Sequence, residues 1–282
     1  MLHDAHNHLQ DEWLTPHLDR IARVAADARI ADMVVNGTHP DDWPRVEALA
    51  TRFSFVRPAY GVHPWDVGRL RDDTWLGQLE SRLATHPSAS IGEIGLDRWI
   101  LDSARPDDPR LTGVRRAPLD EQATVFLPQL ALGAKLNLPV TIHCLQAWSA
   151  LDELLHAHPV PARGFLLHAY GGPAELVPKL AKLGAYFSFN GYFLDPRKTK
   201  QQDTFTLIPA DRLLVETDAP AMPLPQPWRT HKLPPAPDGS AVNHPGNLDA
   251  AYAGLASLRG MPVTELAAQV TANFVRLFGR KD

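Results

Sequence analysis

LHDAHNHL, residues 2–9, is the first of eight short apolar runs in this sequence of 282 residues. It carries His6 and His8, and a longer segment with helical periodicity follows it over residues 14–31. Successive side chains of a strand point to opposite faces, so two histidines spaced by two project to the same side. A strand with two imidazoles on one side, followed by a helix, is the unit from which the rest of the fold is predicted.

Seven further runs of the same kind follow along the chain. They are MVVNG (33–37), SFVRPAYGVHP (54–64), SIGEIGLD (90–97), PVTIHC (139–144), GFLLHAY (164–170), AYFSFNG (185–191) and LLVETDAP (213–220). Helical periodicity is predicted between and after them at 42–53, 72–85, 119–136, 148–156 and 174–183, as a weak turn near 203–207, and in a pair starting at 248 and 263. Nearly continuous apolar runs indicate strands covered on both faces. Their alternation with helices indicates a parallel sheet, and the count of eight predicts a closed α/β barrel of the TIM type.

Composition limits the class of protein. Apolar residues make up 44% and charged residues 21% of the chain, as in a globular protein with a sizeable core. No repeat or linker divides the sequence, so we expect a single domain over residues 1–282. A net charge of −4 excludes a uniformly basic nucleic-acid coat, although a local basic cleft stays open. The sequence is compatible with a monomer and leaves the oligomeric state open.

The chain shows no sign of export or membrane insertion. Its single cysteine, Cys144, cannot form an intramolecular disulfide, and the first residues lack the basic and apolar regions of a signal peptide. No apolar run approaches the roughly 18 residues of a spanning helix. We therefore expect a cytoplasmic protein without a membrane role.

Two long segments rich in proline, arginine and aspartate, residues 98–118 and 219–245, interrupt the strand–helix rhythm. Each follows a strand that carries acidic residues, so in a barrel both should overhang the C-terminal mouth, where substrates bind. Basic side chains in these loops and after the seventh run are candidates for phosphate contacts, although a solvated charge run is the more common meaning of such residues. They are Arg110, Arg115, Arg116, Arg197, Lys198, Lys200, Arg229 and Lys232.

The chemically informative side chains lie in or directly after the runs. These metal-capable residues are His6, His8, Glu93, His143, His168 and Asp218. They are separated by roughly one or more strand–helix units, so a barrel would bring them together at one end. Six ligands exceed the four of a structural zinc site, whereas two ions that share a bridging carboxylate would use all six. Zinc, manganese, magnesium and iron all suit this nitrogen and oxygen donor set.

Other interpretations of these residues are less favoured. A lone histidine is more often hydrogen-bonded in the core than a ligand, and this is the alternative for His143 and His168. The sequence has no GxSxG elbow, Walker motif, Rossmann glycine motif or HExxH zinc motif. Cys144 adjoins His143, but a catalytic thiol needs a base placed in space, and we interpret Cys144 as buried and inert.

The motifs together resemble the TatD family of metal-dependent hydrolases. The resemblance rests on His6-Asn7-His8, GVHPW from Gly61, GEIGLD from Gly92, IHC ending at Cys144, LLHAYGG from Leu166, VETDAP from Val215 and TANFVRLFG near the C-terminus. It implies a distorted TIM barrel of the amidohydrolase superfamily that hydrolyses DNA phosphodiesters, typically from the 3′ end, with two divalent cations.

The resemblance also implies roles for individual residues. His6, His8 and Asp218 would hold one cation, His143 and His168 the other, and Glu93 would bridge them. His63, in GVHP, matches a position that contacts a substrate phosphate. With a metal-activated water as nucleophile, Glu93 and Asp218 become the predicted catalytic residues, Asp218 also serving as proton acceptor.

The sequence departs from the family pattern at two places. After His143 the family commonly has serine and arginine, whereas this chain has Cys144 and Leu145, and the usual Asn-Glu-Pro appears here as Asn243-His244-Pro245. Both departures are expected on the substrate side. The partner predicted first is therefore a DNA end. A small phosphoester, amide or lactone hydrolysed at the same two-metal site is the alternative, and a non-catalytic metal-binding or scaffold protein is the third hypothesis.

Overall fold

Eight parallel strands form one sheet in which neighbours follow chain order from β1 to β8. The strands are β1 (Leu2–Asn7), β2 (Ile30–Asn36), β3 (Val56–Tyr60), β4 (Ser90–Asp97), β5 (Val140–Leu145), β6 (Phe165–Leu167), β7 (Ala185–Asn190) and β8 (Leu213–Glu216). The computed structural model describes residues 1–236 and 239–279. Residues 280–282 of the predicted domain and 237–238 of the second long loop lie outside the described residues.

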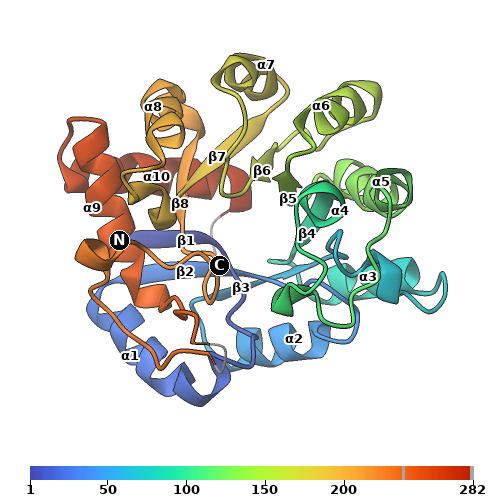
Figure 1. Ribbon diagram of the computed structural model, residues 1–282, viewed down its shortest axis with the longest axis horizontal. Helices are drawn as coiled ribbons and strands as arrows, with labels where there is room; N and C mark the ends of the chain where they lie inside the picture. The colour runs from blue at the N-terminus through green and yellow to red at the C-terminus, as the bar shows by residue number, and fades with distance from the viewer. Residues whose placement is uncertain (237–238, 280–282) are drawn as a thin grey trace.

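Helices surround the strands on the outside of the molecule (Figure 1). They are α1 (Leu18–Asp27), α2 (Trp43–Arg52), α3 (Trp75–Thr85), α4 (Trp99–Asp102), α5 (Leu119–Leu136), α6 (Trp148–Ala157), α7 (Val177–Lys182), α8 (Thr199–Leu207), α9 (Leu248–Leu258) and α10 (Val263–Phe278). Short 3-10 turns accompany them, among them η2 (Val67–Arg69), η3 (Pro109–Leu111), η5 (Gly191–Leu194) and η8 (Pro245–Asn247). The predicted α/β TIM barrel is confirmed.

The first and last strands meet and nearly close the barrel. Just beyond the strand ends, the Asp218 N–H donates to the His6 carbonyl at 3.0 Å, and the His8 N–H donates to the Ala219 carbonyl at 2.8 Å. The buried Asp4 carboxylate on β1 accepts the Thr217 N–H at 2.9 Å and its hydroxyl at 2.6 Å. The first and last strands are thereby joined at the level of the metal-capable residues.

Burial explains the apolar runs. Every residue of β4 and of β7 is buried, because each strand packs against helices outside and against other strands inside the barrel. Gly95 on β4 is paired with His143 on β5. A Cβ atom at Gly95 would lie 2.0 Å from the His143 carbonyl oxygen, and its φ is 148°. Glycine is therefore required at this position for the two strands to approach each other.

The main difference from the predicted helices is α8. A weak turn near 203–207 was expected, but a helix of nine residues runs from Thr199 to Leu207. Its first half is polar, and only Thr204 and Phe205 are buried, so the sequence lacks the apolar periodicity by which helices are recognised.

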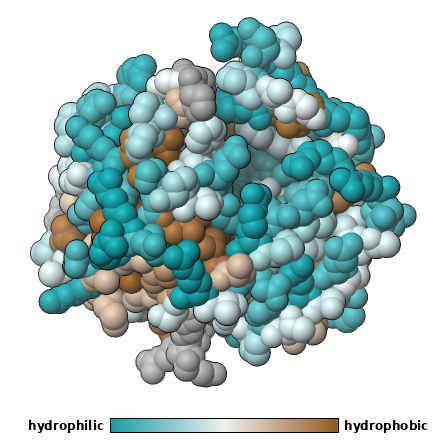
Figure 2. Space-filling model, turned by 90° about the horizontal axis from the view of Figure 1, so that it is seen from below, coloured by the Kyte–Doolittle hydropathy of each residue, from teal (hydrophilic) through white to brown (hydrophobic). Residues whose placement is uncertain are grey.

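The surface of the molecule agrees with the composition. Hydrophilic residues dominate the face seen in Figure 2, and hydrophobic residues appear there in smaller patches. Within residues 1–236 and 239–279, no helix has both the length and the apolar character needed to cross a bilayer.

A buried ionic cluster joins β2 and β3 to the C-terminal helix at the end of the barrel opposite the metal-capable residues. Asp32 accepts Arg57 Nε–H at 2.6 Å, and its other oxygen lies 2.9 Å from His3 Nδ1. Arg57 also donates to the Phe278 carbonyl at 3.2 Å and stacks over the Phe274 ring at 5.4 Å. The cluster attaches α10 to the strands that begin the barrel.

We expect Asp32→Asn to lower the free energy of unfolding by about 3–5 kcal/mol, because the buried Arg57 guanidinium would lose its counter-ion. The matched control is Asp19→Asn, whose ion pair with Arg52 is exposed on both sides and should cost less than about 1 kcal/mol. Urea unfolding followed by circular dichroism measures both. Equal losses for the two variants would contradict a structural role for the buried pair.

Candidate metal centre

The carboxyl ends of the strands bring all six predicted residues together. His6 lies on β1, Glu93 on β4 and His143 on β5. The other three follow a strand: His8 comes directly after β1, His168 directly after β6, and Asp218 two residues after β8. All six are buried or nearly so. The six side chains therefore lie together at one end of the barrel, as expected from the sequence. Their roles as metal ligands stay predictions.

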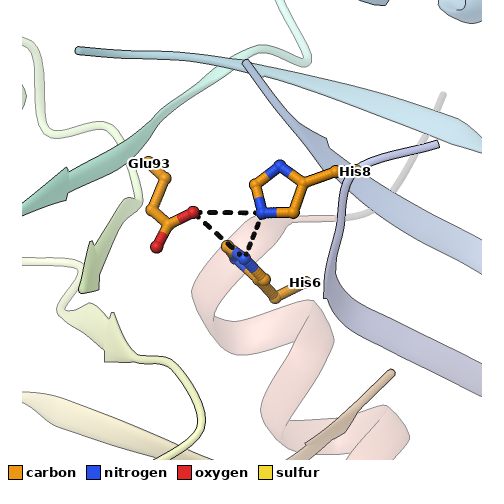
Figure 3. Close-up of side chains that lie close together, drawn as sticks. All are labelled: His6, His8 and Glu93. Carbon is orange, nitrogen blue, oxygen red and sulfur yellow. Dashed lines mark hydrogen bonds and ion pairs between the residues drawn. The ribbon is translucent and has the colours of Figure 1, made fainter. Parts of the chain in front are cut away.

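Glu93 lies at the centre of this group. Its Oε2 atom faces His8 Nε2 at 3.1 Å and His6 Nε2 at 3.4 Å, as Figure 3 shows. Its Oε1 atom faces His168 Nε2 at 2.8 Å and His143 Nδ1 at 3.0 Å. The two oxygens of one carboxylate therefore face two different pairs of imidazoles, the arrangement expected of a bridging ligand.

Asp218 completes the side of the cluster nearest β1. Its Oδ1 atom lies 3.5 Å from both His6 Nε2 and His8 Nε2. The φ of Asp218 is 52°, in the left-handed region that non-glycine residues rarely adopt. A strained residue of this kind is held by its surroundings, here by the backbone bond to His6, and such residues cluster at functional sites.

Ligand atoms in this cluster approach closely enough to hold cations. Three sets have atoms within 4.8 Å of one another: His6, His8 and Glu93; His6, His168 and Asp218; and His63, Glu93 and His143. His168 belongs to both sides, since its ring stacks on His6 at 4.0 Å and its Nε2 lies 3.1 Å from His143 Nδ1. The sets overlap, so the division into two separate ligand groups implied by the family resemblance is less sharp here.

Hydrogen bonds behind the rings orient two imidazoles as ligands. The Nδ1 atom of His8 lies 2.8 Å from the Asn36 carbonyl, which can only accept, so in the neutral ring Nδ1 carries the proton and Nε2 has the lone pair. The Nε2 atom of His143 lies 3.0 Å from Asp97 Oδ2, which leaves the Nδ1 lone pair toward Glu93. Metal-binding histidines typically have such partners.

Glu216 faces His168 from behind as a charged partner without a hydrogen bond. It is fully buried, and its Oε1 atom lies 3.6 Å from His168 Nδ1. The Ser188 hydroxyl donates to Glu216 Oε2, and the Asn190 amide donates to Oε1 at 3.2 Å. The Nδ1 atoms of His6 and His168 are both buried without a hydrogen-bond partner among the described residues.

The charges of the cluster shift the pKa values of its members. Burial alone would raise the pKa of Glu93, but His168, His63 and His6 outweigh it and hold that pKa well below its usual value. Burial disfavours protonated imidazole, yet hydrogen bonds to Asp97 and Glu93 raise the pKa of His143 to about 9. The pKa values of His8 and His168 are also raised well above the ordinary value, by the carboxylates that face each ring.

His63 differs from the other histidines. Burial lowers the pKa of His63, and its Nδ1 atom accepts the Trp65 N–H at 3.1 Å. The neutral ring therefore carries its proton on Nε2, which lies 3.4 Å from Glu93 Oε1. A protonated nitrogen donates hydrogen bonds and cannot bind a cation, so this tautomer fits a substrate contact better than a ligand.

The donor set fits divalent cations. Four imidazoles, those of His6, His8, His143 and His168, lie within 3.5 Å of a carboxylate oxygen of Glu93 or Asp218. The partners of His8 and His143 fix the tautomers needed for ligation. Such a set suits zinc, manganese or iron. The number and identity of the ions are not fixed by the side chains.

Sequence reasoning missed Asp97 and Glu216. Both lie in motifs that were singled out, GEIGLD and VETDAP, but only Glu93 and Asp218 were selected there. Glu216 is the last residue of β8, two residues before Asp218, and Asp97 lies four residues after Glu93 at the end of β4. A second carboxylate in each motif, in a fully buried position, was the available signal, because a buried carboxylate needs a partner.

A cleft of about 1730 Å³ opens above the metal-capable residues. Both long loops contribute to its walls, the first through Trp99, Arg110, Thr112 and Val114, and the second through Ala221, Met222 and Pro223. The expected position at the mouth is confirmed for these residues of the two loops. Cys144 also lines the cleft but is only 8% exposed, and burial raises the pKa of its thiol, in agreement with an inert cysteine.

Most of the basic candidates for phosphate contacts have other partners. Arg110 pairs with Asp108, Arg115 with Glu121 and Arg197 with Asp195. The side chains of Arg116 and Arg229 donate to backbone carbonyls. Lys198 and Lys200 line the cleft, and Lys198 Nζ lies 4.9 Å above the Tyr192 ring.

The two departures from the family pattern have different outcomes. Leu145 lines the cleft and is 39% exposed, so an apolar side chain replaces a cation on the substrate side. His244 was expected there too, but it is fully buried, stacks on His231 at 5.2 Å, and is absent from the described residues that line the cleft. Its Nδ1 atom accepts the Gly246 N–H at 2.8 Å, so it caps η8 instead.

The chain is similar to known proteins over nearly its whole length. A family model described as TatD related DNase matches residues 3–279. The 3'-5' ssDNA/RNA exonuclease TatD of Shigella flexneri is 32% identical over 93% of this chain and 92% of that protein, and the uncharacterized metal-dependent hydrolase YabD of Bacillus subtilis is 29% identical over 99% of both.

A solved structure agrees with these relatives. The crystal structure of YJJV, a TATD homolog from Escherichia coli, is 27% identical and superposes with a TM-score of 0.83 over 99% of this chain and 98% of that one. The fold, the shared motifs and the family model therefore lead to one conclusion. The chain belongs to the TatD family of metal-dependent hydrolases.

Proposed function

We propose that this protein is a 3′–5′ exonuclease that hydrolyses phosphodiester bonds at the ends of DNA strands with two divalent cations. The observation that carries the proposal is the position of Glu93, whose two oxygens face two pairs of imidazoles. Two cations about one bridging carboxylate are the usual apparatus of phosphodiester hydrolysis. The similarity to an exonuclease of Shigella flexneri supports the choice of substrate.

The residues divide between two positions. His6, His8 and Asp218 would hold one cation and His143 and His168 the other, with Glu93 shared between them. When bound, the cations supply Lewis acidity, which makes water ionise near neutral pH and stabilises negative charge on phosphoryl oxygens. The Asn36 backbone carbonyl and the Asp97 carboxylate accept hydrogen bonds that keep His8 and His143 aimed at these positions, and the Glu216 carboxylate faces His168 Nδ1 at 3.6 Å.

Two residues act on the substrate and on protons. Asp218 Oδ1 faces His6 and His8, so we assign to Oδ2 the acceptance of the proton that the attacking water loses. The low pKa of the Asp218 carboxyl, held down by its hydrogen bonds with His6 and His8 against the effect of burial, keeps it ionised. His63 Nε2–H donates a hydrogen bond to a phosphate oxygen.

A small phosphoester is the second candidate substrate. The observation in its favour is that two arginines of the cleft already have ion-pair partners. Arg69 pairs with Asp66 and Arg110 with Asp108, and Leu145, which also lines the cleft, is uncharged. A long polyanion gains affinity from each phosphate contact with an unpaired cation, so few such contacts favour a short substrate.

Incubation of the protein with a single-stranded oligonucleotide and Mn²⁺ or Mg²⁺ should release 3′-terminal nucleotides. Glu93→Gln should reduce this activity by at least about 100-fold, since it removes the bridging charge. Glu80→Gln, which changes an exposed carboxyl group on α3, is the matched control and should leave activity unchanged. Hydrolysis of small phosphoesters alone would favour the second candidate, and inactivity toward both would favour a non-catalytic metal-binding protein.

Asp97→Asn should weaken metal binding about 10- to 100-fold, because the carboxylate that orients His143 is lost. Titration with Mn²⁺ under isothermal calorimetry measures the change. Asp102→Asn, an exposed substitution at the end of α4, is the control. An affinity equal to that of the unsubstituted protein would refute an orienting role for Asp97.

Metal affinity should fall in mild acid. In the metal-free protein the pKa of His143 is raised to about 9 and those of His8 and His168 are raised well above their ordinary value, so these imidazoles carry protons at neutral pH that a cation must displace. Each displaced proton weakens binding about tenfold per unit decrease in pH. Calorimetry in two buffers of different ionisation enthalpy counts the released protons, and a count of zero would exclude this coupling.

A further inference from the structure

Three flat side chains are stacked along one wall of the cleft. Trp65 follows β3, Trp99 begins α4 and Arg110 lies in η3, and all three line the cleft. The rings of Trp65 and Trp99 are nearly parallel, with centroids 5.9 Å apart and planes at 23°. The Arg110 guanidinium carbon lies 4.6 Å from the centroid of the Trp99 ring. We call these three residues the aromatic stack.

The aromatic stack starts beside the metal centre. Trp65 Nε1–H donates to Asp97 Oδ2 at 2.6 Å, and this is the oxygen that faces His143 Nε2 at 3.0 Å. The Trp65 ring also packs against His63, with centroids 5.7 Å apart. The stack therefore has a fixed position relative to the side chains that would contact the scissile phosphate, and it extends outward from them into the cleft.

The charge of Arg110 is already compensated. Its Nε–H and one terminal N–H donate to the two oxygens of Asp108 at 2.9 and 2.7 Å, and its backbone N–H donates to the same carboxylate at 3.1 Å. An arginine bound in this bidentate way has little left to offer a phosphate. Its exposed planar face, with the side chain 60% accessible, is what remains available to a ligand.

The opposite wall of the cleft has another character. Lys198 and Lys200 lie at the start of α8, the helix that follows β7, and both line the cleft. Among the described residues, no carboxylate lies within salt-bridge distance of either lysine. In Figure 1, β7 lies across the barrel from β3, four positions along the sheet. A ligand that spans the cleft would thus meet cations on one side and flat π surfaces on the other.

We propose that the aromatic stack is a base-binding subsite, in which a nucleobase next to the scissile phosphodiester stacks on the Arg110 guanidinium, which the Trp99 ring supports from its other side. This inference rests on the proposed nuclease function and adds the residues that recognise the base. Stacking on aromatic rings and guanidinium planes is how proteins bind single-stranded nucleic acid irrespective of sequence, because every base has a π face. The bases of a duplex are paired and stacked on each other, so the subsite also selects unpaired ends.

The test compares two oligonucleotides that differ only at the 3′ end, one intact and one with abasic sugars in the last two positions. The unsubstituted protein should cleave the intact strand with a kcat/KM roughly 5- to 150-fold higher, the range expected for one base stack. Trp99→Ala should remove this preference mainly through KM, whereas Trp99→Phe should retain part of it. Trp13→Ala, an exposed tryptophan absent from the described cleft lining, is the matched control.

A binding measurement separates this inference from the proposed function. Fluorescence anisotropy of the 5′-labelled intact strand is measured in the presence of a chelator, so that no cleavage occurs, and Trp99→Ala should weaken binding while Trp13→Ala does not. If the protein cleaves the strand and Trp99→Ala keeps the full preference for it, the subsite is wrong and the nuclease function stands. If the unsubstituted protein neither binds nor cleaves either strand, the proposed function fails and the subsite fails with it.

Discussion

The meeting of the first strand with the last is the constraint on which the site depends. His6 and His8 come from the beginning of the chain and Asp218 from a position more than two hundred residues later, and two backbone hydrogen bonds, Asp218 to His6 and His8 to Ala219, hold them in contact. The Asp4 carboxylate, buried and bonded to Thr217, fixes the same junction. A barrel left open at this seam would still have a core, but its ligand atoms would be split between two edges of the sheet.

The same convergence creates an electrostatic problem that a cation solves. Four imidazoles and two carboxylates are buried together, and burial penalises every charged form. Without metal the cluster compensates by protonating imidazoles next to Glu93 and Asp218, which is why the pKa of His143 rises to about 9 and that of Glu93 falls. A divalent cation can replace these protons, since the Asn36 carbonyl and Asp97 already hold the rings of His8 and His143 with one nitrogen facing the centre.

How much of this could be predicted depends on the kind of signal. The limits of β4 and α5 follow from continuous apolar character and helical periodicity, and the six ligand-type residues could be selected because each lies in or directly after an apolar run. Asp97 and Glu216 escaped because their role is to touch another side chain, and which histidine they touch depends on strand register. The prediction that His244 lies on the substrate side was wrong for a similar reason. Its ring stacks on His231, and this contact depends on how the loop packs, which sequence spacing does not predict.

The two ends of the barrel divide stability from chemistry. At one end the charges of Asp32 and Arg57 neutralise each other, and Arg57 packs over the Phe274 ring and donates to the Phe278 carbonyl. At the other end Arg110 is neutralised by Asp108 and Arg69 by Asp66, whereas Lys198 and Lys200 line the cleft without an ion-pair partner among the described residues. These lysines and any bound cations act on every phosphate alike. Selection among phosphoesters then falls to uncharged surfaces of the cleft, and Trp65 and Trp99 form a flat one beside the metal centre.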